Sequence, residues 1–257
     1  MNNPITNDWP WQQASDYISP LSVFDPPSLF AKAMSDTIPI EPGSTRLLDI
    51  GCGSGIIGIY CLVKKKARFV TFNDIQDIAI LETRANVTRH IQQGTIRETQ
   101  VASQKGAFAA IPPSIIAHHN LIVFNLPQLP TDYLDKDYKT KVEADQSMSY
   151  FRLGGKDGLK IARNFFGWYA GLKKPPAAVI LLSSFLGKSR IREAIEKHGI
   201  EWKILKETKI ILREIFTKQA DKFSKNESEI KDRSLERNAD GKWTKKLLTI
   251  RMIPQAK

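Results

Sequence analysis

Short apolar runs alternate with amphipathic stretches through the middle of the chain. Runs bounded by turn residues predict strands, and windows with helical spacing predict the helices between them. This alternation is typical of a doubly wound α/β fold with a mostly parallel, Rossmann-like sheet. The predicted strands are residues 46–50, 69–73, 95–102, 121–125 and 177–183, and the predicted helices are residues 28–34, 56–64, 77–92, 158–172 and 188–198.

The two ends of the chain depart from this pattern. Residues 203–216 and 243–253 predict an antiparallel hairpin at one edge, which brings the expected sheet to seven strands. The connection near 217–242 has hardly any apolar side chains, so we expect a mobile polar insertion there. Residues 1–45 are irregular and are expected to form a cap on the substrate side, ahead of a single domain over 46–257.

Composition excludes several classes of protein. The 257 residues are 42% hydrophobic, which is enough for one large core, and no apolar run reaches the roughly 18 residues of a membrane span. The two cysteines cannot form a disulfide scaffold, and the N-terminus lacks a secretory pattern, so we expect a cytoplasmic protein without a membrane partner. The pair His118 and His119 lacks further ligands at suitable spacing, so no metal site is predicted. No oligomeric state follows from the sequence.

The net charge of +11 is concentrated near the C-terminus. From residue 186 onward, 19 Lys and Arg stand against 11 Asp and Glu. Solvated helix faces and a polar loop can account for this excess. The alternative is that the basic C-terminal quarter binds nucleic acid, such as RNA in the ribosome.

The segment LLDIGCGSGIIGIYC, residues 47–61, places glycines between the first strand and the next helix. Gly53, Gly55 and Gly58 fit the dinucleotide fingerprint, which would make the protein an NAD(P)-dependent oxidoreductase. Asp49 argues against that hypothesis, because its carboxylate would repel a pyrophosphate bound at the turn. A ligand that carries an ammonium and a sulfonium would instead be attracted, and S-adenosylmethionine is such a ligand.

Asp74 ends the second strand, where a carboxylate can accept hydrogen bonds from both ribose hydroxyls. That role supports a nucleoside without choosing between the two cofactors. Together, LLDIGCGSGIIGIYC and VTFNDIQ resemble the class I S-adenosylmethionine-dependent methyltransferases, over roughly residues 24–185. The resemblance implies that Asp49 lies near the methionyl amine and that Asp74 holds the ribose. It further implies cofactor contacts from Gly51, Gly53, Gly55, Ile75, Asn125 and, at the adenine, Gln104 in place of an acidic residue.

The segment LIVFNLPQLP, residues 121–130, ends a strand at Asn125 and continues in an extended form because of its prolines. It resembles the Asn-Pro-Pro-Tyr motif of amino-group methyltransferases, which include the release-factor glutamine and N6-adenine enzymes. FRLGGKDGLKIARNFF and VFDPPSLFAKAM resemble further stretches of that group. Leu126 and Gln128 replace the first proline and the aromatic residue, so a flat acceptor loses stacking worth about 1–3 kcal/mol per base.

The resemblance implies in-line methyl transfer to an amide or amine nitrogen, with Asn125 and the carbonyl of Leu126 or Pro127 orienting the acceptor. Asn125 and Pro127 are the candidate catalytic residues, and the candidate substrate contacts are Leu126, Gln128, Tyr133 and Phe24.

The acceptor is expected to belong to a protein, an RNA or a small molecule, and the missing aromatic residue slightly favours the small molecule. Methylation at sulfur or oxygen is an alternative, since Asn-x-Pro-Gln faintly resembles plant methionine S-methyltransferases. A third hypothesis is a non-catalytic, methyltransferase-like binding subunit.

Overall fold

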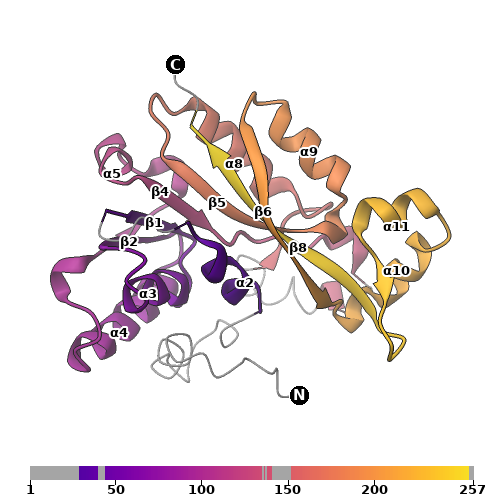
Figure 1. Cartoon of the computed structure of the whole chain (residues 1–257), viewed down its shortest axis with the longest axis horizontal. Coiled ribbons are helices and arrows are strands. Elements are labelled where there is room, and N and C mark those ends of the chain that lie inside the picture. Colours follow the sequence, from indigo (N-terminus) through magenta and orange to yellow (C-terminus); the bar gives the residue numbers. More distant parts are fainter. Residues whose placement is uncertain (1–28, 40–43, 135, 137, 141–151, 255–257) are drawn as a thin grey trace. The chain divides into compact units, whose positions relative to one another are not determined.

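The computed structural model describes residues 29–39, 44–134, 136, 138–140 and 152–254 (Figure 1). These residues form two compact units. The first consists of the described residues up to 125 together with 174–180, and the second of residues from 126 to 173 together with those from 181 onward. The segment 1–45 and the domain 46–257 expected from the sequence stay predictions, and residues 1–28 lie outside the described residues.

The first unit contains a parallel sheet in the order β3-β2-β1-β4-β5. Its inner strands are buried almost throughout, as expected for a parallel sheet covered on both faces. Figure 1 shows α3 and α4 on one side of these strands and α5 on the other. The strands are β1 (Arg46–Ile50), β2 (Phe69–Asp74), β3 (Val101–Lys105), β4 (Leu121–Phe124) and β5 (Ala177–Ser183), and the helices are α2 (Leu29–Thr37), α3 (Ile56–Val63), α4 (Asp77–Gln92) and α5 (Pro113–Ala117).

In the second unit the last residues of β5 continue a ladder in the order β5-β8-β6, and β7 also pairs with β8. The pairs β6–β8 and β7–β8 are antiparallel. The strands are β6 (Glu201–Ile211), β7 (Glu236–Arg237) and β8 (Trp243–Ile253), and the helices are α8 (Lys160–Gly171), α9 (Lys188–Glu196), α10 (Thr217–Phe223) and α11 (Glu227–Arg233). A buried cluster forms part of its core and consists of Leu129, Phe185, Leu212, Phe216, Ala220, Leu235 and Trp243.

The expected α/β fold with a mostly parallel sheet and an antiparallel pair is confirmed, but the described residues form eight strands rather than the expected seven, because the short β7 also pairs with β8. The strand predicted over 95–102 is wrong at its start. A short 3-10 helix, Glu98–Gln100, comes first, and β3 begins at Val101, the residue that aligns with Val70 of β2. The segment near 217–242 contains α10, α11 and β7 rather than an unstructured connection, and its mobility stays a prediction.

No helix of the described residues has both the length and the apolar character needed to cross a membrane.

Candidate functional site

The turn between β1 and α3 depends on its glycines. Gly51, Gly53 and Gly55 have φ angles of 61°, 56° and 81°, in the left-handed region that other residues rarely adopt. Gly58 serves packing instead, because a Cβ there would lie 2.4 Å from Cε1 of Phe72 on β2. The glycines therefore shape an open turn and let α3 approach the sheet closely.

Asp49 lies beneath this turn. Its Oδ2 accepts a hydrogen bond of 3.0 Å from the Gly58 amide, and its side chain is almost fully buried. Burial, with a smaller contribution from the nearby Asp74 and against the lowering effect of the Gly58 amide, raises the pKa of this carboxyl to about 7. A positively charged ligand group at the turn would favour the ionised form.

Asp74, at the end of β2, connects the turn to the sheet. Its Oδ2 accepts from the Gly53 amide at 3.1 Å, and its Oδ1 accepts from the Gln76 amide at 2.9 Å. Burial raises the pKa of this carboxyl, while the amides of Gln76, Gly53 and Ile75 lower it. The carboxylate is thus held by backbone donors at the position where a ribose contact is predicted.

Two residues of α4 that the sequence analysis did not identify fix the same turn. The Thr83 hydroxyl donates to the Gly53 carbonyl at 2.8 Å, and the Asn86 amide donates to the Ser54 carbonyl at 2.9 Å. Thr83 and Asn86 are three residues apart and therefore share one face of the helix. Polar residues at that spacing on the buried face of α4 were the signal in the sequence.

Gln104 and Ile75 have side chains suited to contact an adenosine. Oε1 of Gln104 is buried and lacks a hydrogen-bond partner in the described part of the chain, so it can accept from an amino group of a ligand. The Ile75 side chain is 55% exposed and offers apolar surface beside Asp74. A buried hydrogen-bond acceptor and an exposed apolar side chain both suit the adenosine part of S-adenosylmethionine.

Asn125 follows β4 in the first unit. Its half-buried side chain forms no hydrogen bond with any residue that the structure describes. In the second unit the Pro127 carbonyl is likewise unbonded among the described groups, whereas the Leu126 side chain is buried. The Asn125 amide and the Pro127 carbonyl are therefore available to a ligand.

Gln128 and Tyr133, expected to contact the acceptor, are engaged within the second unit. The Gln128 amide bonds to the backbone of Leu181 and Ser183. The Tyr133 hydroxyl accepts from Arg190 at 3.0 Å, and its ring packs edge-on against Phe185. Phe24 lies outside the described residues.

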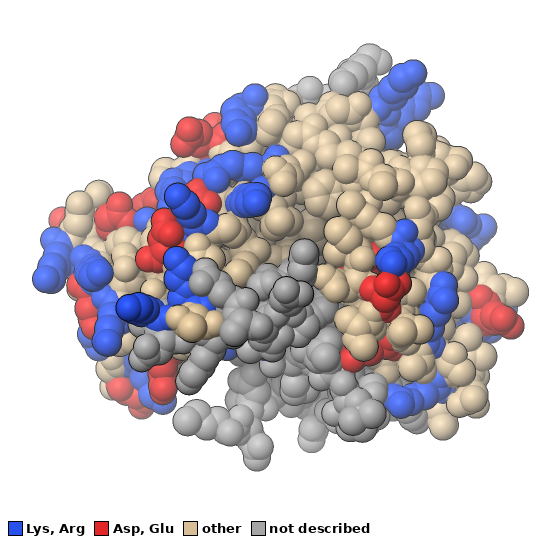
Figure 2. All heavy atoms as spheres, turned by 180° about the vertical axis from the view of Figure 1, so that it is seen from behind, with Lys and Arg blue, Asp and Glu red and all other residues tan. Residues whose placement is uncertain are grey.

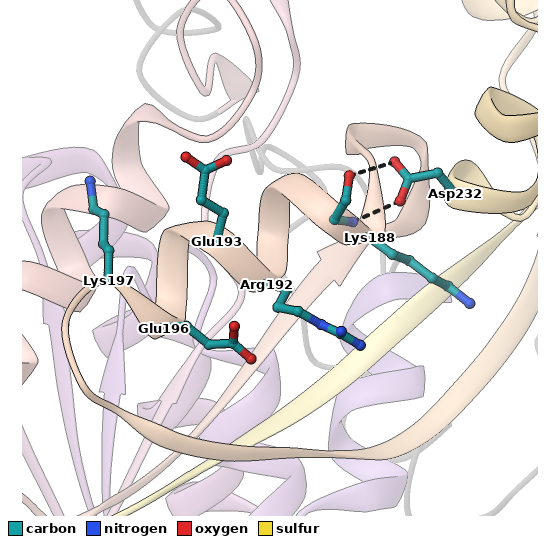
Figure 3. A pocket seen from close by; sticks show the side chains of 7 residues that line it. Lys188, Arg192, Glu193, Glu196, Lys197 and Asp232 are labelled. Carbon is teal, nitrogen blue, oxygen red and sulfur yellow. Dashed lines mark hydrogen bonds between the residues drawn. The ribbon is translucent and has the colours of Figure 1, made fainter.

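A hollow of about 490 Å³ lies along α9 in the second unit (Figure 3). Three basic and three acidic side chains line it, so it carries no net charge. Asp232 reaches Ser189 there, with Oδ1 accepting from the Ser189 amide at 2.7 Å and Oδ2 from its hydroxyl at 3.1 Å. Figure 2 likewise shows basic and acidic side chains together on one face of the molecule. The charged lining consists of Lys188, Arg192, Glu193, Glu196, Lys197 and Asp232.

Sequence comparison relates the N-terminal part of the chain to known enzymes. Residues 26–122 match the family described as "Methyltransferase small domain". The chain is 32% identical over 92 residues to ribosomal RNA large subunit methyltransferase G of Aeromonas salmonicida, covering 35% of this chain and 24% of that one. It is 32% identical over 129 residues to ribosomal RNA small subunit methyltransferase C of Haemophilus ducreyi, covering 49% of this chain and 35% of that one. The chain thus spans about a quarter to a third of the length of these relatives.

Structural comparison agrees on the fold. The solved structure of a candidate RNA methyltransferase from Pyrococcus horikoshii matches with a TM-score of 0.51 and 13% identity, covering 96% of this chain and 98% of that one. Residues 26–122 of the chain are thus similar to a methyltransferase family, and the fold is that of a solved methyltransferase-like structure.

Proposed function

We propose that this protein is an enzyme that transfers a methyl group from S-adenosylmethionine to a nitrogen atom of an RNA. The observation that carries the proposal is the place of Asn125. It directly follows β4, which is aligned with β1 through Phe124 opposite Ile50, and β1 leads into the glycine turn. The carboxyl ends of neighbouring parallel strands share one edge of a sheet, so the unbonded Asn125 amide and the glycine turn belong to one site.

Bound S-adenosylmethionine would supply a methyl group on a positively charged sulfur, which the acceptor lone pair takes in line. The residues of this chain orient the acceptor. In the first unit, Asn125 Oδ1 would accept a hydrogen bond from an amino group, which directs the lone pair of that nitrogen away from the Asn125 amide. In the second unit, the Pro127 carbonyl offers a further hydrogen-bond acceptor. The acceptor nitrogen held by these residues would take the methyl group as the sulfur–carbon bond breaks, and would then release a proton to solvent.

In the first unit, the proposed cofactor contacts are divided among the strand ends. Asp49 would face the methionyl amine, and Asp74 would hold the ribose. Gln104 and Ile75 would contact the adenine, with Oε1 of Gln104 accepting from its amino group. The glycines Gly51, Gly53 and Gly55 leave room for the ligand beside the backbone.

Two observations support an RNA acceptor. The relatives from Aeromonas and Haemophilus are named as ribosomal RNA methyltransferases. The last quarter of the chain is strongly basic, which suits a polyanion. The small-molecule acceptor that the missing aromatic residue favoured has no support among these relatives. A cytoplasmic location belongs to the same proposal.

The first test is calorimetric titration of the wild type with S-adenosylhomocysteine and, separately, with NADH. We expect micromolar binding of S-adenosylhomocysteine alone, lost in Asp74→Ala and retained in Asp77→Ala. Asp77 is a matched control because its exposed carboxylate pairs with Lys105 on the surface. Binding of NADH alone would contradict the proposal.

The second test follows radioactive methyl groups from S-adenosylmethionine into ribosomal RNA, with the modified nucleoside identified by mass spectrometry. We expect an N-methylated nucleoside, and RNA binding that weakens steeply with salt. Label on a sulfur or oxygen atom would contradict N-methylation. Label found only on protein or on a small molecule would contradict an RNA acceptor. Cofactor binding without transfer to any acceptor would support a binding subunit.

A further inference from the structure

We infer that Gln128 is a positioning residue, which anchors the acceptor segment Leu126-Pro127 to the end of β5 and does not itself contact the acceptor. The inference rests on the proposed function, because it assigns a role within the same site.

The Gln128 side chain bonds to the backbone of β5 as a neighbouring strand would. Its Nε2 donates to the Leu181 carbonyl at 2.9 Å, and its Oε1 accepts from the Ser183 amide at 2.7 Å. A residue in a parallel strand uses this same pair of groups, one residue before and one residue after its partner. The side-chain amide therefore acts as a backbone group opposite Leu182.

Within the second unit, this arrangement gives the last residues of β5 a strand-like partner. In the first unit, the backbone of β4 is aligned with β5 through Phe124 opposite Ile180. Without the Gln128 amide, the Leu181 carbonyl and the Ser183 N–H would lose the partners that the structure gives them. Nε2 also lies 3.5 Å from the Leu126 carbonyl oxygen, so both donors of the amide are directed at backbone carbonyls and not at an acceptor.

The segment GGKDG, residues 154–158, holds Gln128 from a second direction. A Cβ on Gly154 would lie 2.7 Å from the Gln128 Cα, and a Cβ on Gly158 would lie 2.8 Å from the Gln128 carbonyl oxygen. The backbones are also bonded, since the Leu129 amide donates to the Arg152 carbonyl at 2.7 Å and the Gly154 amide donates to the Leu129 carbonyl at 2.9 Å. These glycines therefore permit a backbone contact that no other residue could make.

Asp157 fixes that segment in turn. Its Oδ1 accepts from the Leu159 amide at 3.0 Å, and its Oδ2 accepts from Arg163 at 2.6 Å and from Arg190 at 2.7 Å. The acceptor segment is thus held on one side by an amide bonded to β5 and on the other by a braced glycine backbone. These contacts also fix the Pro127 carbonyl, because Pro127 directly precedes Gln128 in the chain.

The experiment compares the wild type with Gln128→Ala, Gln128→Asn and Gln128→Glu, and with Gln93→Ala as a control at an exposed glutamine. The probes are S-adenosylhomocysteine for binding and ribosomal RNA for methyl transfer. For Gln128→Ala we expect unchanged affinity for S-adenosylhomocysteine and a kcat that falls about tenfold to a hundredfold, because the acceptor is misaligned. Gln128→Asn, one methylene shorter, should behave in the same way.

Gln128→Glu supplies a readout that a purely structural residue would not give. Its carboxylate can still accept from the Ser183 amide but cannot donate to the Leu181 carbonyl, whereas the protonated acid can. We therefore expect the kcat of Gln128→Glu, relative to the wild type, to rise as the pH falls. Hydrogen exchange should accelerate in peptides that cover residues 181–185 of Gln128→Ala, with no change over residues 51–58.

Three results would overturn the inference: wild-type kcat in Gln128→Ala, loss of S-adenosylhomocysteine binding in that variant, or a raised KM for RNA at constant kcat. The last would mean that Gln128 contacts the acceptor. If the wild type transfers no methyl group to RNA, the proposed function fails. The exchange rate at residues 181–185 then decides separately whether Gln128 anchors the segment.

Discussion

The amide of Gly58, in the first turn of α3, donates a hydrogen bond of 3.0 Å to Oδ2 of Asp49 within β1. This bond places a buried carboxyl group under the N-terminus of a helix. Burial still dominates, and the pKa of Asp49 is raised to about 7. The carboxyl therefore titrates close to physiological pH, and its charge is coupled both to folding and to any cation bound at the turn.

Asp49 should make the free protein less stable as the pH rises. Its pKa is about 7 in the folded state and 3.8 in the unfolded chain, so the folded state binds more protons between these values. The contribution of Asp49 to the free energy of unfolding is then complete below about pH 4 and is lost as the pH rises through about 7. Urea unfolding between pH 5 and 8 should show Asp49→Asn gaining stability relative to the wild type. Parallel curves for the two proteins would contradict this.

Ligand binding should show the opposite dependence on pH. A cationic amine prefers the ionised Asp49, so binding below about pH 7 requires the carboxyl to release a proton. We expect the affinity for S-adenosylhomocysteine to fall by up to about tenfold per pH unit in that range. Calorimetry in buffers of different ionisation enthalpy would detect the proton. Asp49→Asn should bind more weakly and without proton release, and proton release in that variant would assign it to another group.

Gln104→Leu should separate a ligand contact from a structural one. The buried Oε1 has no partner among the described residues, so its removal should leave the free energy of unfolding unchanged or raise it by about 1 kcal/mol. The affinity for S-adenosylhomocysteine should fall severalfold, because an acceptor for the adenine amino group is lost. Urea unfolding and calorimetry measure the two effects, and Gln93→Leu is the control. Lower stability with intact affinity would show that Gln104 serves the fold.

Gly58→Ala should destabilise the first unit. The added Cβ would lie 2.4 Å from Cε1 of Phe72 and 2.8 Å from Cγ1 of Val70, so α3 must move away from β2. Overpacking of this kind costs about 1–3 kcal/mol. Gly171→Ala, in α8, is the matched control, since no atom lies within 4 Å of its Cβ position. Equal midpoints of chemical unfolding for the two variants would refute the packing argument.

Arg233→Met should destabilise the second unit by about 3 kcal/mol. The Arg233 side chain is buried, donates to the Phe185 carbonyl and to Glu229, and lies 3.9 Å from the ring centroid of Phe223. The variant would leave the Phe185 carbonyl unbonded. Lys231→Met on the same helix is the control, because its ion pair with Glu227 is exposed and contributes little. Thermal unfolding of both variants measures the two losses of stability. Equal unfolding midpoints would contradict this prediction.

The sequence predicted the elements whose apolar pattern was continuous. The strands β1 and β5 have their predicted bounds, because each is buried from its second residue to its last. Residues 77–92 form α4 as predicted, although its buried face also carries polar side chains. The helices α10 and α11 escaped prediction because they bury few apolar side chains. Their anchors include Ala220 and the guanidinium of Arg233, and an arginine counts as polar in any hydrophobic pattern.

The sequence predicted those parts of the candidate site that belong to a recognisable motif. The left-handed glycines and the carboxylates of Asp49 and Asp74 are visible in the sequence because only certain residues fit those places. The role of Gln128 was not visible, because it depends on the backbone of residues 181–183, more than fifty positions away. The sequence predicted an acceptor contact for Gln128, whereas the structure shows its side chain bonded to the backbone of Leu181 and Ser183.

The hydrogen bonds from Thr83 and Asn86 to the carbonyls of the glycine turn have a thermodynamic consequence. Glycines lose more conformational entropy than other residues when they become ordered. Because α4 holds the turn through these bonds, that entropy is lost during folding and does not have to be lost again when a ligand binds. In Thr83→Val part of this loss would move to the binding step, where it appears as a less favourable binding entropy at nearly constant enthalpy.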